Sequence, residues 1–600
     1  MTAPPTPGVH LDGDAATFVV WAAYASRVDL VIGEAQQRHP MSRVGDTIDT
    51  RELWTVTVPG VTGGTRYGYS LDGGPVRPDP RTRHQPDGVH RMSAVETAPF
   101  DWRHDFPGVP LRDLVIYELH VGTFTPEGTL DAAIGQLADL AELGVNAIEL
   151  LPVSQFPGDR GWGYDGVHPF AVQNTYGGPA ALRRLVDAAH GMGLAVLMDC
   201  VYNHFGPEGN YLPEFGPYLT GRIRTPWGDG LNVDSRGCDE VRRFIVDNVR
   251  LWIDEFRLDG LRLDAIQTIV DVSARHILAD IAAAAHEIGE RDGREVVIIG
   301  ETDQHDVRIV TPPAENGLGL DAIWNDDFHH AVHALVTGER DTYYADFHPP
   351  YTTPAAAIAE VARKVYSRDG RFWHGRGHRA GAPAGETDRK RFVIGIQNHD
   401  QTGNRAYGER LHRLCEPAAY RLAAGLMLLS NQTPMLFQGE EYAEPAPFCF
   451  FCDFQDPALN DAVRRGRARE YWPEGTEWTD DMPDPPRRRT FERSKLSWDW
   501  SDPDRAAVRT LYQTLLRLRR QWPLEEPVAA ALDGPVLRLD QGNRRVLANL
   551  SAEPAAIDAV DATLSTEQPK FGGTRAELGG IDQLRPWELI VPRDNAHPPQ

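Results

Sequence analysis

Four short segments of the chain each place polar side chains at the end of an apolar run: residues 199–204, 260–265, 299–302 and 397–400. Besides Asp199, they contain three carboxylates, one arginine and two histidines, namely Asp264, Glu301, Asp400, Arg262, His204 and His399. Hydrolysis of a glycosidic bond needs one carboxyl group to protonate the leaving oxygen and a second to attack or stabilise the cationic sugar. The four segments together therefore predict a glycosidase.

The spacing of Arg262 and Asp264 points to a nucleophile. The two residues are two positions apart in a predicted strand, so their side chains point to the same face. A guanidinium beside a carboxylate favours the ionised form, which suits a nucleophile at neutral pH. We therefore predict Asp264 as the nucleophile, the alternative being an interior salt bridge that fills the core. Asp199 is predicted to orient Arg262 rather than to react.

Glu301 follows the very apolar run 296–300. Desolvation in such surroundings raises the pKa of a carboxyl group, and a general acid that works near pH 7 requires a raised pKa. We predict Glu301 as the general acid, with a glutamate at a helix N-terminus as the alternative. Asp264 and Glu301 are expected to have carboxyl groups about 5–5.5 Å apart, as in retaining enzymes.

The remaining polar groups are predicted to contact sugar. Asp400 is expected to hold hydroxyls and favour the oxocarbenium-like state, and His204 and His399 to donate hydrogen bonds to the sugar being cleaved. The segment containing Trp162 and Tyr164 offers an aromatic ring for stacking on a sugar face, although a core role is the alternative.

The elements that must position these residues follow a βα rhythm. Eight apolar strands alternate with amphipathic helices, which predicts an α/β fold with a (β/α)8 barrel whose catalytic groups emerge at the carboxyl ends of the strands. The predicted strands are 114–121, 145–153, 194–201, 258–265, 296–302, 322–327, 392–397 and 434–438. The predicted helices include 130–143, 180–192, 241–256, 272–289, 418–429 and 505–521.

Both ends of the chain read as smaller β-domains. Short strands separated by Gly, Pro and Asp turns predict an N-terminal β-sandwich of the Ig-like or E-set type over 1–98, and strand-like runs predict a small C-terminal β-domain over 526–600. The barrel then occupies 99–525. Two long excursions interrupt it, at 202–240 and 440–500, and the arginines of the second are expected to lie in a solvated loop rather than an anion site.

Composition excludes several classes of protein. A net charge of −25 disfavours nucleic acid, because its recognition relies on clustered basic groups. No run of about 18 apolar residues is present, so no membrane span is expected. The five cysteines form no disulfide framework, and Cys449 and Cys452 read as buried thiols. A cytoplasmic protein without a signal peptide, metal or other cofactor is the simplest reading, and the sequence predicts no particular oligomeric state.

The four segments resemble the motifs of the α-amylase family, glycoside hydrolase family 13. In that family the residues that match Asp264, Glu301 and Asp400 are the nucleophile, the acid/base and the transition-state stabiliser of a retaining mechanism. The resemblance extends over the N-terminal β-domain, which debranching and branching members carry. Asn203 matches a position that binds calcium in some amylases, but many members lack the ion.

A narrower resemblance concerns the substrate. Four stretches, 78–90, 202–212, 225–228 and 324–330, resemble members of the family that act on maltooligosyltrehalose. That resemblance implies hydrolysis of the α-1,4 bond beside a terminal trehalose, which releases trehalose and a maltooligosaccharide. The 324–330 segment is predicted to recognise the trehalose end, with Trp324 or Phe328 as wall or core. The predicted hydroxyl partners are Asn325, Asp326, Asp327 and His329. Packing of the barrel rim is the alternative.

Two other functions compete with this prediction. A glycogen-branching or debranching enzyme would use the same carboxylates, since the glycosyl-enzyme can pass to a sugar hydroxyl instead of water. A catalytically inactive carbohydrate-binding protein on the same barrel is disfavoured, because such a protein is expected to lose one or more carboxylates and none is missing here.

Overall fold

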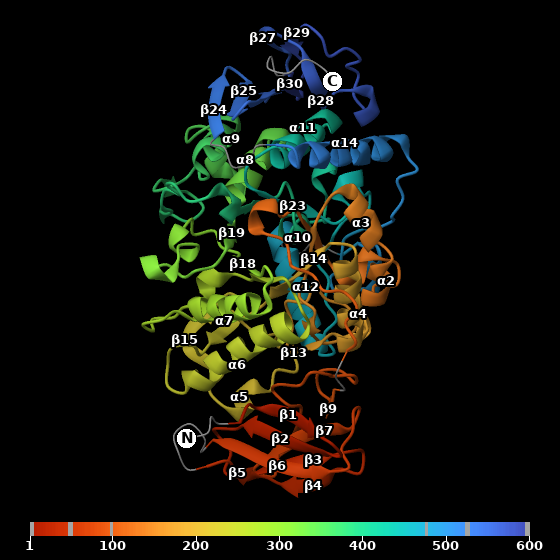
Figure 1. Ribbon diagram of the computed structural model, residues 1–600, viewed down its shortest axis with the longest axis vertical. Helices are drawn as coiled ribbons and strands as arrows, with labels where there is room; N and C mark the ends of the chain where they lie inside the picture. Colours follow the sequence, from red (N-terminus) through yellow and green to blue (C-terminus); the bar gives the residue numbers. More distant parts are fainter. Residues whose placement is uncertain are drawn as a thin grey trace.

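The computed structural model describes residues 5–45, 52–96, 100–473, 478–479, 481–522 and 528–593. The chain forms an elongated molecule with a β-sandwich at one end, a barrel in the middle and a second β-domain at the other end (Figure 1). The two predicted domain limits, at 98/99 and 525/526, fall outside the described residues and remain proposals.

The N-terminal part consists of two antiparallel sheets. Rings on their facing sides pack together: Phe18 and Tyr67 are fully or nearly fully buried, with ring centroids 5.1 Å apart. This confirms the predicted sandwich. One sheet has the order β1 (Gly8–Asp12), β2 (Ala15–Trp21), β6 (Leu53–Pro59) and β5 (Ser42–Arg43), and the other contains β4 (Gln37–Pro40), β3 (Val28–Ile32), β7 (Arg66–Leu71), β8 (Val76–Arg77) and β9 (Ser93–Ala94).

Eight parallel strands close into a barrel, as predicted. The first seven observed strands are shorter than the apolar runs that predicted them, because the outer residues of each run lie in the loops, and the eighth has the predicted length but begins one residue earlier. In spatial order the strands are β10 (Ile116–Leu119), β11 (Ala147–Leu150), β14 (Ala195–Cys200), β17 (Gly260–Leu263), β18 (Val297–Gly300), β19 (Ala322–Trp324), β22 (Phe392–Ile394) and β23 (Thr433–Phe437).

Residues that alternate along the strands fill the barrel interior, with apolar side chains at the amino ends and polar ones at the carboxyl ends. Ile116, Ala147, Leu197, Ile299 and Trp324 belong to one buried apolar cluster. Because side chains two residues apart share a face, the next inward position on β10, β11 and β14 is polar: Glu118, Glu149 and Asp199. Glu301 and Asp326 come two positions after Ile299 and Trp324, just beyond the ends of β18 and β19. The alternation of side chains along the strands thus places polar groups at the mouth of the barrel.

The helices surround this barrel, with several limits that differ from the prediction. The expected helix 130–143 is split into two short helices, and 241–256 ends in a π-helical turn at Leu251–Glu255. Helix α7 begins at Ile277 rather than at 272, because His276 caps it by accepting the Leu278 N–H. The main helices are α2 (Leu130–Ile134), α3 (Leu137–Leu143), α4 (Gly178–Gly191), α6 (Cys238–Arg250), α7 (Ile277–Asp292), α8 (Asp326–Thr337), α9 (Pro354–Lys364), α10 (His399–Gly403), α11 (Pro417–Leu428) and α14 (Pro503–Arg519).

The long excursions are more ordered than expected. The first carries α5 (Leu212–Phe215) and a hairpin of β15 (Leu219–Thr225) and β16 (Gly228–Leu231). The second contains helices α12 (Pro457–Tyr471) and α13 (Arg488–Glu492), so the prediction of a loop is wrong there. The predicted exposure of the arginines is confirmed, because α12 buries none of its residues and Arg487, Arg488 and Arg489 are exposed. Asp456 caps α12, and Arg464 on that helix pairs with Asp484 at 2.9 Å.

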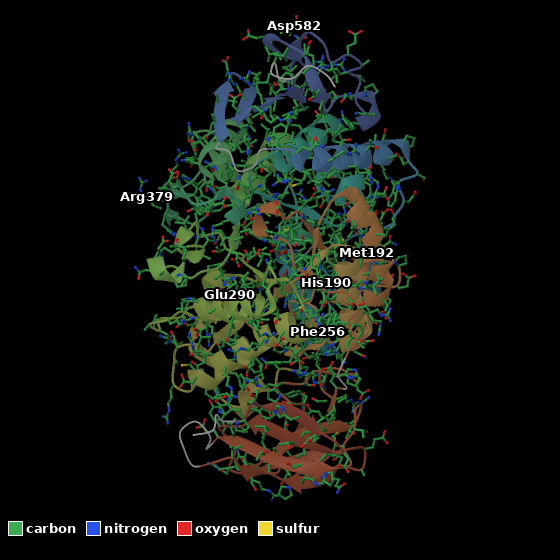
Figure 2. All side chains as sticks on the ribbon, viewed as in Figure 1. His190, Met192, Phe256, Glu290, Arg379 and Asp582 are labelled. Atoms are coloured by element: carbon green, nitrogen blue, oxygen red, sulfur yellow. The ribbon has the colours of Figure 1, made fainter. Side chains whose placement is uncertain are left out.

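The C-terminal part is a five-stranded antiparallel sheet beside a two-stranded antiparallel sheet. The sheet order is β24 (Val528–Asp533), β25 (Val536–Gln541), β26 (Arg544–Asn549), β30 (Leu589–Pro592) and β28 (Ala562–Ser565), and β27 (Ala555–Val560) pairs with β29 (Ile581–Leu584). Asp582 of β29 marks this end of the molecule, while Arg379 lies at one side of the barrel (Figure 2).

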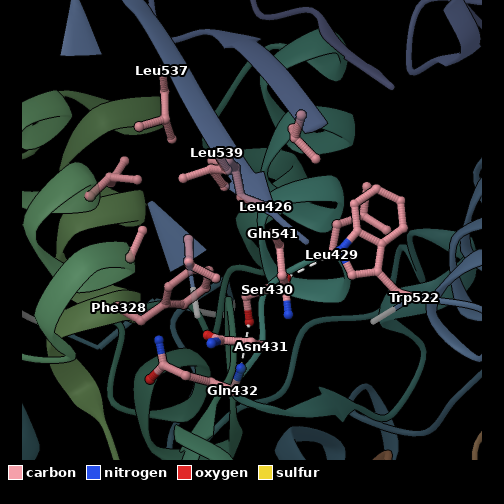
Figure 3. A pocket seen from close by; sticks show the side chains of 14 residues that line it. Phe328, Leu426, Leu429, Ser430, Asn431, Gln432, Trp522, Leu537, Leu539 and Gln541 are labelled. Atoms are coloured by element: carbon pink, nitrogen blue, oxygen red, sulfur yellow. Dashed lines mark hydrogen bonds between the residues drawn. The ribbon is translucent and has the colours of Figure 1, made fainter. Parts of the chain in front are cut away.

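An apolar pocket lies between the C-terminal sheet and the barrel helices. Leucines from both sides line it, including Leu426 and Leu537, and Trp522 closes one wall by donating to Gln541 at 3.2 Å (Figure 3). None of the strand-end carboxylates lines this pocket. The candidate chemistry therefore lies elsewhere. No helix among the described residues is long and apolar enough to cross a membrane.

Candidate active site

The three predicted catalytic carboxylates lie at the mouth of the barrel and differ in exposure. The Asp264 and Glu301 side chains are 11% and 16% exposed, and that of Asp400 is 48% exposed. Arg262, by contrast, is completely buried. A ligand in the mouth can thus reach all three carboxylates but not the guanidinium behind them.

Arg262 joins the carboxylates of three strands. One guanidinium nitrogen donates to Asp199 Oδ2 at 2.6 Å and to Asp264 Oδ1 at 2.7 Å, and the other lies 3.6 Å from Glu301 Oε2. Arg262 thus contacts Asp264, as predicted, and Asp199 lies where it can orient the guanidinium. The Trp324 ring packs over the same guanidinium, with its centroid 4.4 Å from Cζ, so Trp324 belongs to the core rather than to a sugar-facing wall.

Asp264 is held by donors on both oxygens. Besides Arg262 at Oδ1, Asn203 donates its amide to Oδ2 at 3.0 Å. The next residue, Ala265, has a left-handed backbone (φ 40°) that a non-glycine residue adopts at a cost. This turn aims the Ala265 N–H at Glu301 Oε2, 2.6 Å away. The residue that follows the predicted nucleophile therefore donates a hydrogen bond to the predicted acid.

Glu301 has the electrostatic character expected of a general acid. Burial raises its pKa to about 8, with the negative charges of Asp264 and Asp400 adding to the increase and Arg262 opposing it. Because Oε2 accepts the Ala265 N–H, the proton of the neutral acid belongs on Oε1. The sequence-based prediction of a raised pKa is confirmed.

His399 and His204 use their ring nitrogens within the protein. His399 contacts Glu118 and Tyr164, at 2.5 Å and 2.7 Å. His204 contacts the Asn203 side chain at 2.7 Å and the Tyr164 carbonyl at 3.1 Å. Direct donation from these rings to a sugar, as predicted, is therefore not supported; they orient the groups that line the mouth.

The two aromatic residues after strand β11 have different places. Trp162 is 4% exposed and stacks on Phe448, with centroids 5.3 Å apart, so the prediction of a sugar platform is wrong and the core alternative is right. Tyr164 is partly exposed, stacks on His399 and donates its hydroxyl to Asp199 at 2.6 Å. On the β15–β16 hairpin, Trp227 is 52% exposed and its ring stacks on that of His204. The sequence did not predict Trp227 as an aromatic wall.

The segment after strand β19 requires a correction. The strand ends at Trp324, and Asp326 begins helix α8, because acidic residues stabilise a helix N-terminus. Asp327 is completely buried and is bound by Arg368 and Ser367. Asn325 donates to the Val365 carbonyl and to Gln432, and His329 contacts the Ile396 carbonyl. Asn325, Asp327 and His329 are therefore structural and not hydroxyl partners.

Asp326 alone among these acidic residues faces the site. It is partly exposed, and its oxygen lies 3.4 Å from the Gln401 amide. Burial and the neighbouring Asp400 raise its pKa to about 6. In this position the carboxyl group can accept a hydrogen bond from a sugar hydroxyl when it is ionised and donate one when it is protonated.

Sequence reasoning missed two buried glutamates inside the barrel. Glu118 binds His399, and Glu149 lies opposite Glu118 in the β10–β11 register. Burial and the charge of Glu118 raise the pKa of Glu149 to about 8. The signal was present, since a glutamate interrupts each of the first two apolar strands at an inward position. Cys449 and Cys452 are buried free thiols, as expected.

Comparison with known families agrees with this geometry. A model of the α-amylase catalytic domain matches residues 85–217, and a model of carbohydrate-binding module 48 (isoamylase N-terminal domain) matches residues 7–80. A closed barrel with this carboxylate site and this N-terminal module defines the class: the chain is a glycoside hydrolase of the α-amylase type.

Relatives narrow the class. The chain is 45% identical to the malto-oligosyltrehalose trehalohydrolase of Saccharolobus solfataricus, over 86% of this chain and 87% of that protein. It is 43% identical to that of Arthrobacter ramosus, over 96% and 99%. A crystal structure of a putative α-amylase from Salmonella typhimurium superposes with a TM-score of 0.87 at 35% identity, covering 98% of this chain and 99% of that one. The chain belongs to the malto-oligosyltrehalose trehalohydrolase family.

Proposed function

We propose that this enzyme hydrolyses the α-1,4-glucosidic bond beside the terminal trehalose of maltooligosyltrehalose, releasing trehalose and a maltooligosaccharide. The observation that carries the hydrolysis is the contact of one guanidinium, that of Arg262, with the carboxylates of Asp264 and Glu301 at the barrel mouth. The trehalose end of the substrate is supported by the names of the relatives, which match over nearly the whole chain.

In the first step an Asp264 oxygen attacks C1 of the glucose on the maltooligosyl side of the bond. The bond from C1 to the trehalose oxygen breaks, and Glu301 transfers its proton to that oxygen from Oε1. Trehalose leaves, and the maltooligosaccharide remains covalently bound to Asp264. The donors Arg262 and Asn203 align the attacking carboxylate.

In the second step the ionised Glu301 takes a proton from water, and the water oxygen attacks C1. The bond between C1 and Asp264 breaks, which releases the maltooligosaccharide with its original anomeric configuration and restores both carboxyl groups. Asp400, the most exposed of the three, is placed to hold sugar hydroxyls and to stabilise the oxocarbenium-like state.

Selection of the trehalose end requires polar groups beyond the cleavage point. We assign part of that role to Asp326, because it is partly exposed and lies beside Asp400. A site that hydrogen-bonds particular hydroxyls rejects ligands that lack them more strongly than an apolar pocket does.

Product analysis tests the proposal. Trehalose release from maltooligosyltrehalose should exceed hydrolysis of a maltooligosaccharide of equal length by at least about tenfold, or about 1.4 kcal/mol. Glycogen and starch serve as parallel substrates, and Glu301→Gln supplies the inactive control. Equal rates on the two oligosaccharides would show an amylase activity without selection of the trehalose end. New α-1,6 branches in glycogen would show a branching activity.

We also propose that the enzyme works in the reducing cytoplasm. All five cysteines are free thiols, three of them buried, and free thiols are typical of reducing compartments. Growth-phase fractionation of the source cells, followed by activity assay of each fraction, tests this location.

A further inference from the structure

Glu118 lies on the first barrel strand, and its carboxylate is directed to His399 rather than to the three catalytic carboxylates. It is 1% exposed. One oxygen accepts from the His399 ring at Nδ1, 2.5 Å away, and the other accepts the His399 backbone N–H at 2.9 Å. A carboxylate that binds both the backbone and the ring of one residue fixes the orientation of that ring.

The opposite ring nitrogen of His399 faces the active site. Nε2 lies 2.7 Å from the Tyr164 hydroxyl and 3.5 Å from Asp400 Oδ1. The Tyr164 hydroxyl donates its only proton to Asp199 Oδ2, at 2.6 Å. Its oxygen must therefore accept the proton of His399 Nε2. With Nδ1–H donating to Glu118, the hydrogen bonds require protons on both ring nitrogens, which is the imidazolium form.

The charges around His399 favour that form. Burial opposes a charged imidazole, but the carboxylates of Glu118 and Asp400 outweigh it, and the pKa of His399 rises to about 9. Arg262 acts in the opposite direction. The other titratable neighbours are His120, whose pKa burial lowers to about 4, Glu149, whose pKa burial raises to about 8, and Asp199 and Tyr164, which the hydrogen bonds above connect to Arg262.

We propose that Glu118 is a positioning residue for hydrolysis: it holds His399 as an oriented imidazolium that fixes Asp400 and Tyr164 at the cleavage site. The chain of contacts runs from strand β10 through His399 to Asp400, the most exposed catalytic carboxylate. Besides its ion pair with His399, Asp400 has one side-chain hydrogen-bond donor among the described residues, Asn404 at 3.2 Å. The effect on turnover rests on the proposed function, whereas the charge of His399 does not.

A titration of His399 tests the charge directly and needs no substrate. Histidine labelled with 13C at Cε1 is introduced into the deuterated protein, and the His399 signal is assigned by its loss in His399→Gln. In the unmutated enzyme this signal should remain that of an imidazolium at pH 7.5. In Glu118→Gln the pKa of His399 should fall by at least about one unit. Glu440→Gln is the matched control, because Glu440 is equally buried but accepts from Tyr512 at 3.0 Å, and it should leave the His399 signal unchanged.

Kinetics then separate positioning from a general loss of structure. At pH 7.5 Glu118→Gln should lower kcat at least about tenfold. When the pH is lowered to 5.5, the ratio of the variant kcat to the unmutated kcat should rise at least about threefold, because His399 regains its proton. Any α-glucan that the enzyme cleaves serves as substrate.

Two results would overturn the proposal. A His399 that is neutral at pH 7.5 in the unmutated enzyme would do so even if Glu118→Gln fails to fold. A ratio of variant to unmutated kcat that is the same at every pH would also do so, because a merely structural defect carries no dependence on protonation. Absence of trehalose among the products would contradict the proposed function but would leave the titration result intact.

Discussion

At the scale of single residues, the site is organised by one buried guanidinium. Arg262 has no exposed surface, yet it contacts Asp199 and Asp264 and lies near Glu301. A buried charge of this kind is stable only when it is paired. The carboxylates therefore stabilise the arginine, and the arginine in turn sets the directions of the groups that are proposed to react.

The role of Asp264 can be tested by an isosteric change. Asp264→Asn keeps the shape and can still accept from Arg262, but an amide oxygen cannot form the glycosyl-enzyme. We expect kcat to fall by more than about a thousandfold, while substrate binding and the thermal midpoint change little. Retention of more than about a tenth of the activity would assign the nucleophile to another residue.

The raised pKa of Glu301 predicts the alkaline limb of the pH profile. The acid must be protonated in the free enzyme, and burial raises its pKa to about 8. The value of kcat/KM should therefore be maintained below that pH and fall as the pH rises through about 8. A steady-state profile measured from pH 5 to 10 checks this, and a limb near pH 4.5, the ordinary value of a glutamate, would show that the carboxyl group is not desolvated in solution.

At the scale of elements, the start of helix α8 separates two adjacent acidic residues. Asp326 faces the mouth of the barrel, whereas Asp327 turns inward to Arg368 and Ser367 from the loop after α9. Arg368 and nearby hydrogen bonds outweigh burial and hold the pKa of Asp327 far below its usual range. Neighbours in sequence thus carry different functions, because a helix turns its side chains by about 100° per residue.

Alanine variants at these two positions should behave differently. Asp327→Ala removes the carboxylate that Arg368 contacts at 2.7 Å and leaves this largely buried guanidinium with Asp346 at 3.6 Å. The change should cost about 3 kcal/mol of stability, which will appear as a lower thermal midpoint. Asp326→Ala should leave the midpoint nearly unchanged but reduce the preference for maltooligosyltrehalose over a maltooligosaccharide of equal length. The same loss of specificity in both variants, without destabilisation of Asp327→Ala, would show that Asp327 also contacts substrate.

At the scale of the whole molecule, the N-terminal sandwich is tied to the barrel by buried charge. Arg81 lies between strands β8 and β9, has a side chain that is 6% exposed and pairs with Asp247 of α6 at 2.7 Å. Its guanidinium also lies over the rings of Phe170 and Phe244. Such a contact couples the unfolding of the two parts.

Removal of this contact should weaken that coupling. Arg81→Ala removes the 2.7 Å partner of Asp247 and leaves that carboxylate with Arg243 and Arg250 at 3.7 and 3.6 Å. The change should cost about 1–3 kcal/mol, so calorimetry is expected to resolve a separate, earlier transition. Arg112→Ala is the matched control, because Arg112 and its partner Asp113 are both exposed and such pairs contribute about 0–1 kcal/mol. A single transition at an unchanged temperature in Arg81→Ala would mean that other contacts hold the sandwich.

The sequence alone determined the barrel, its strand ends and the pairing of Arg262 with Asp264, because the period of a strand decides which side chains share a face. It also indicated the desolvated environment of Glu301 from the apolar run before it. Tertiary structure alone decided which neighbours complete each group. Trp162 is a core residue because Phe448 returns to it from a distant loop, and Asp327 is structural because Arg368 reaches it. Glu118 acquires its partner His399, 281 residues further along the chain, only because the barrel closes through the pairing of β10 with β23. That closure brings the first strand within reach of helix α10, which follows the seventh strand, β22. The local sequence pattern determines the face to which a side chain points. Contacts between residues this far apart in the sequence are determined only by the packing of the whole fold.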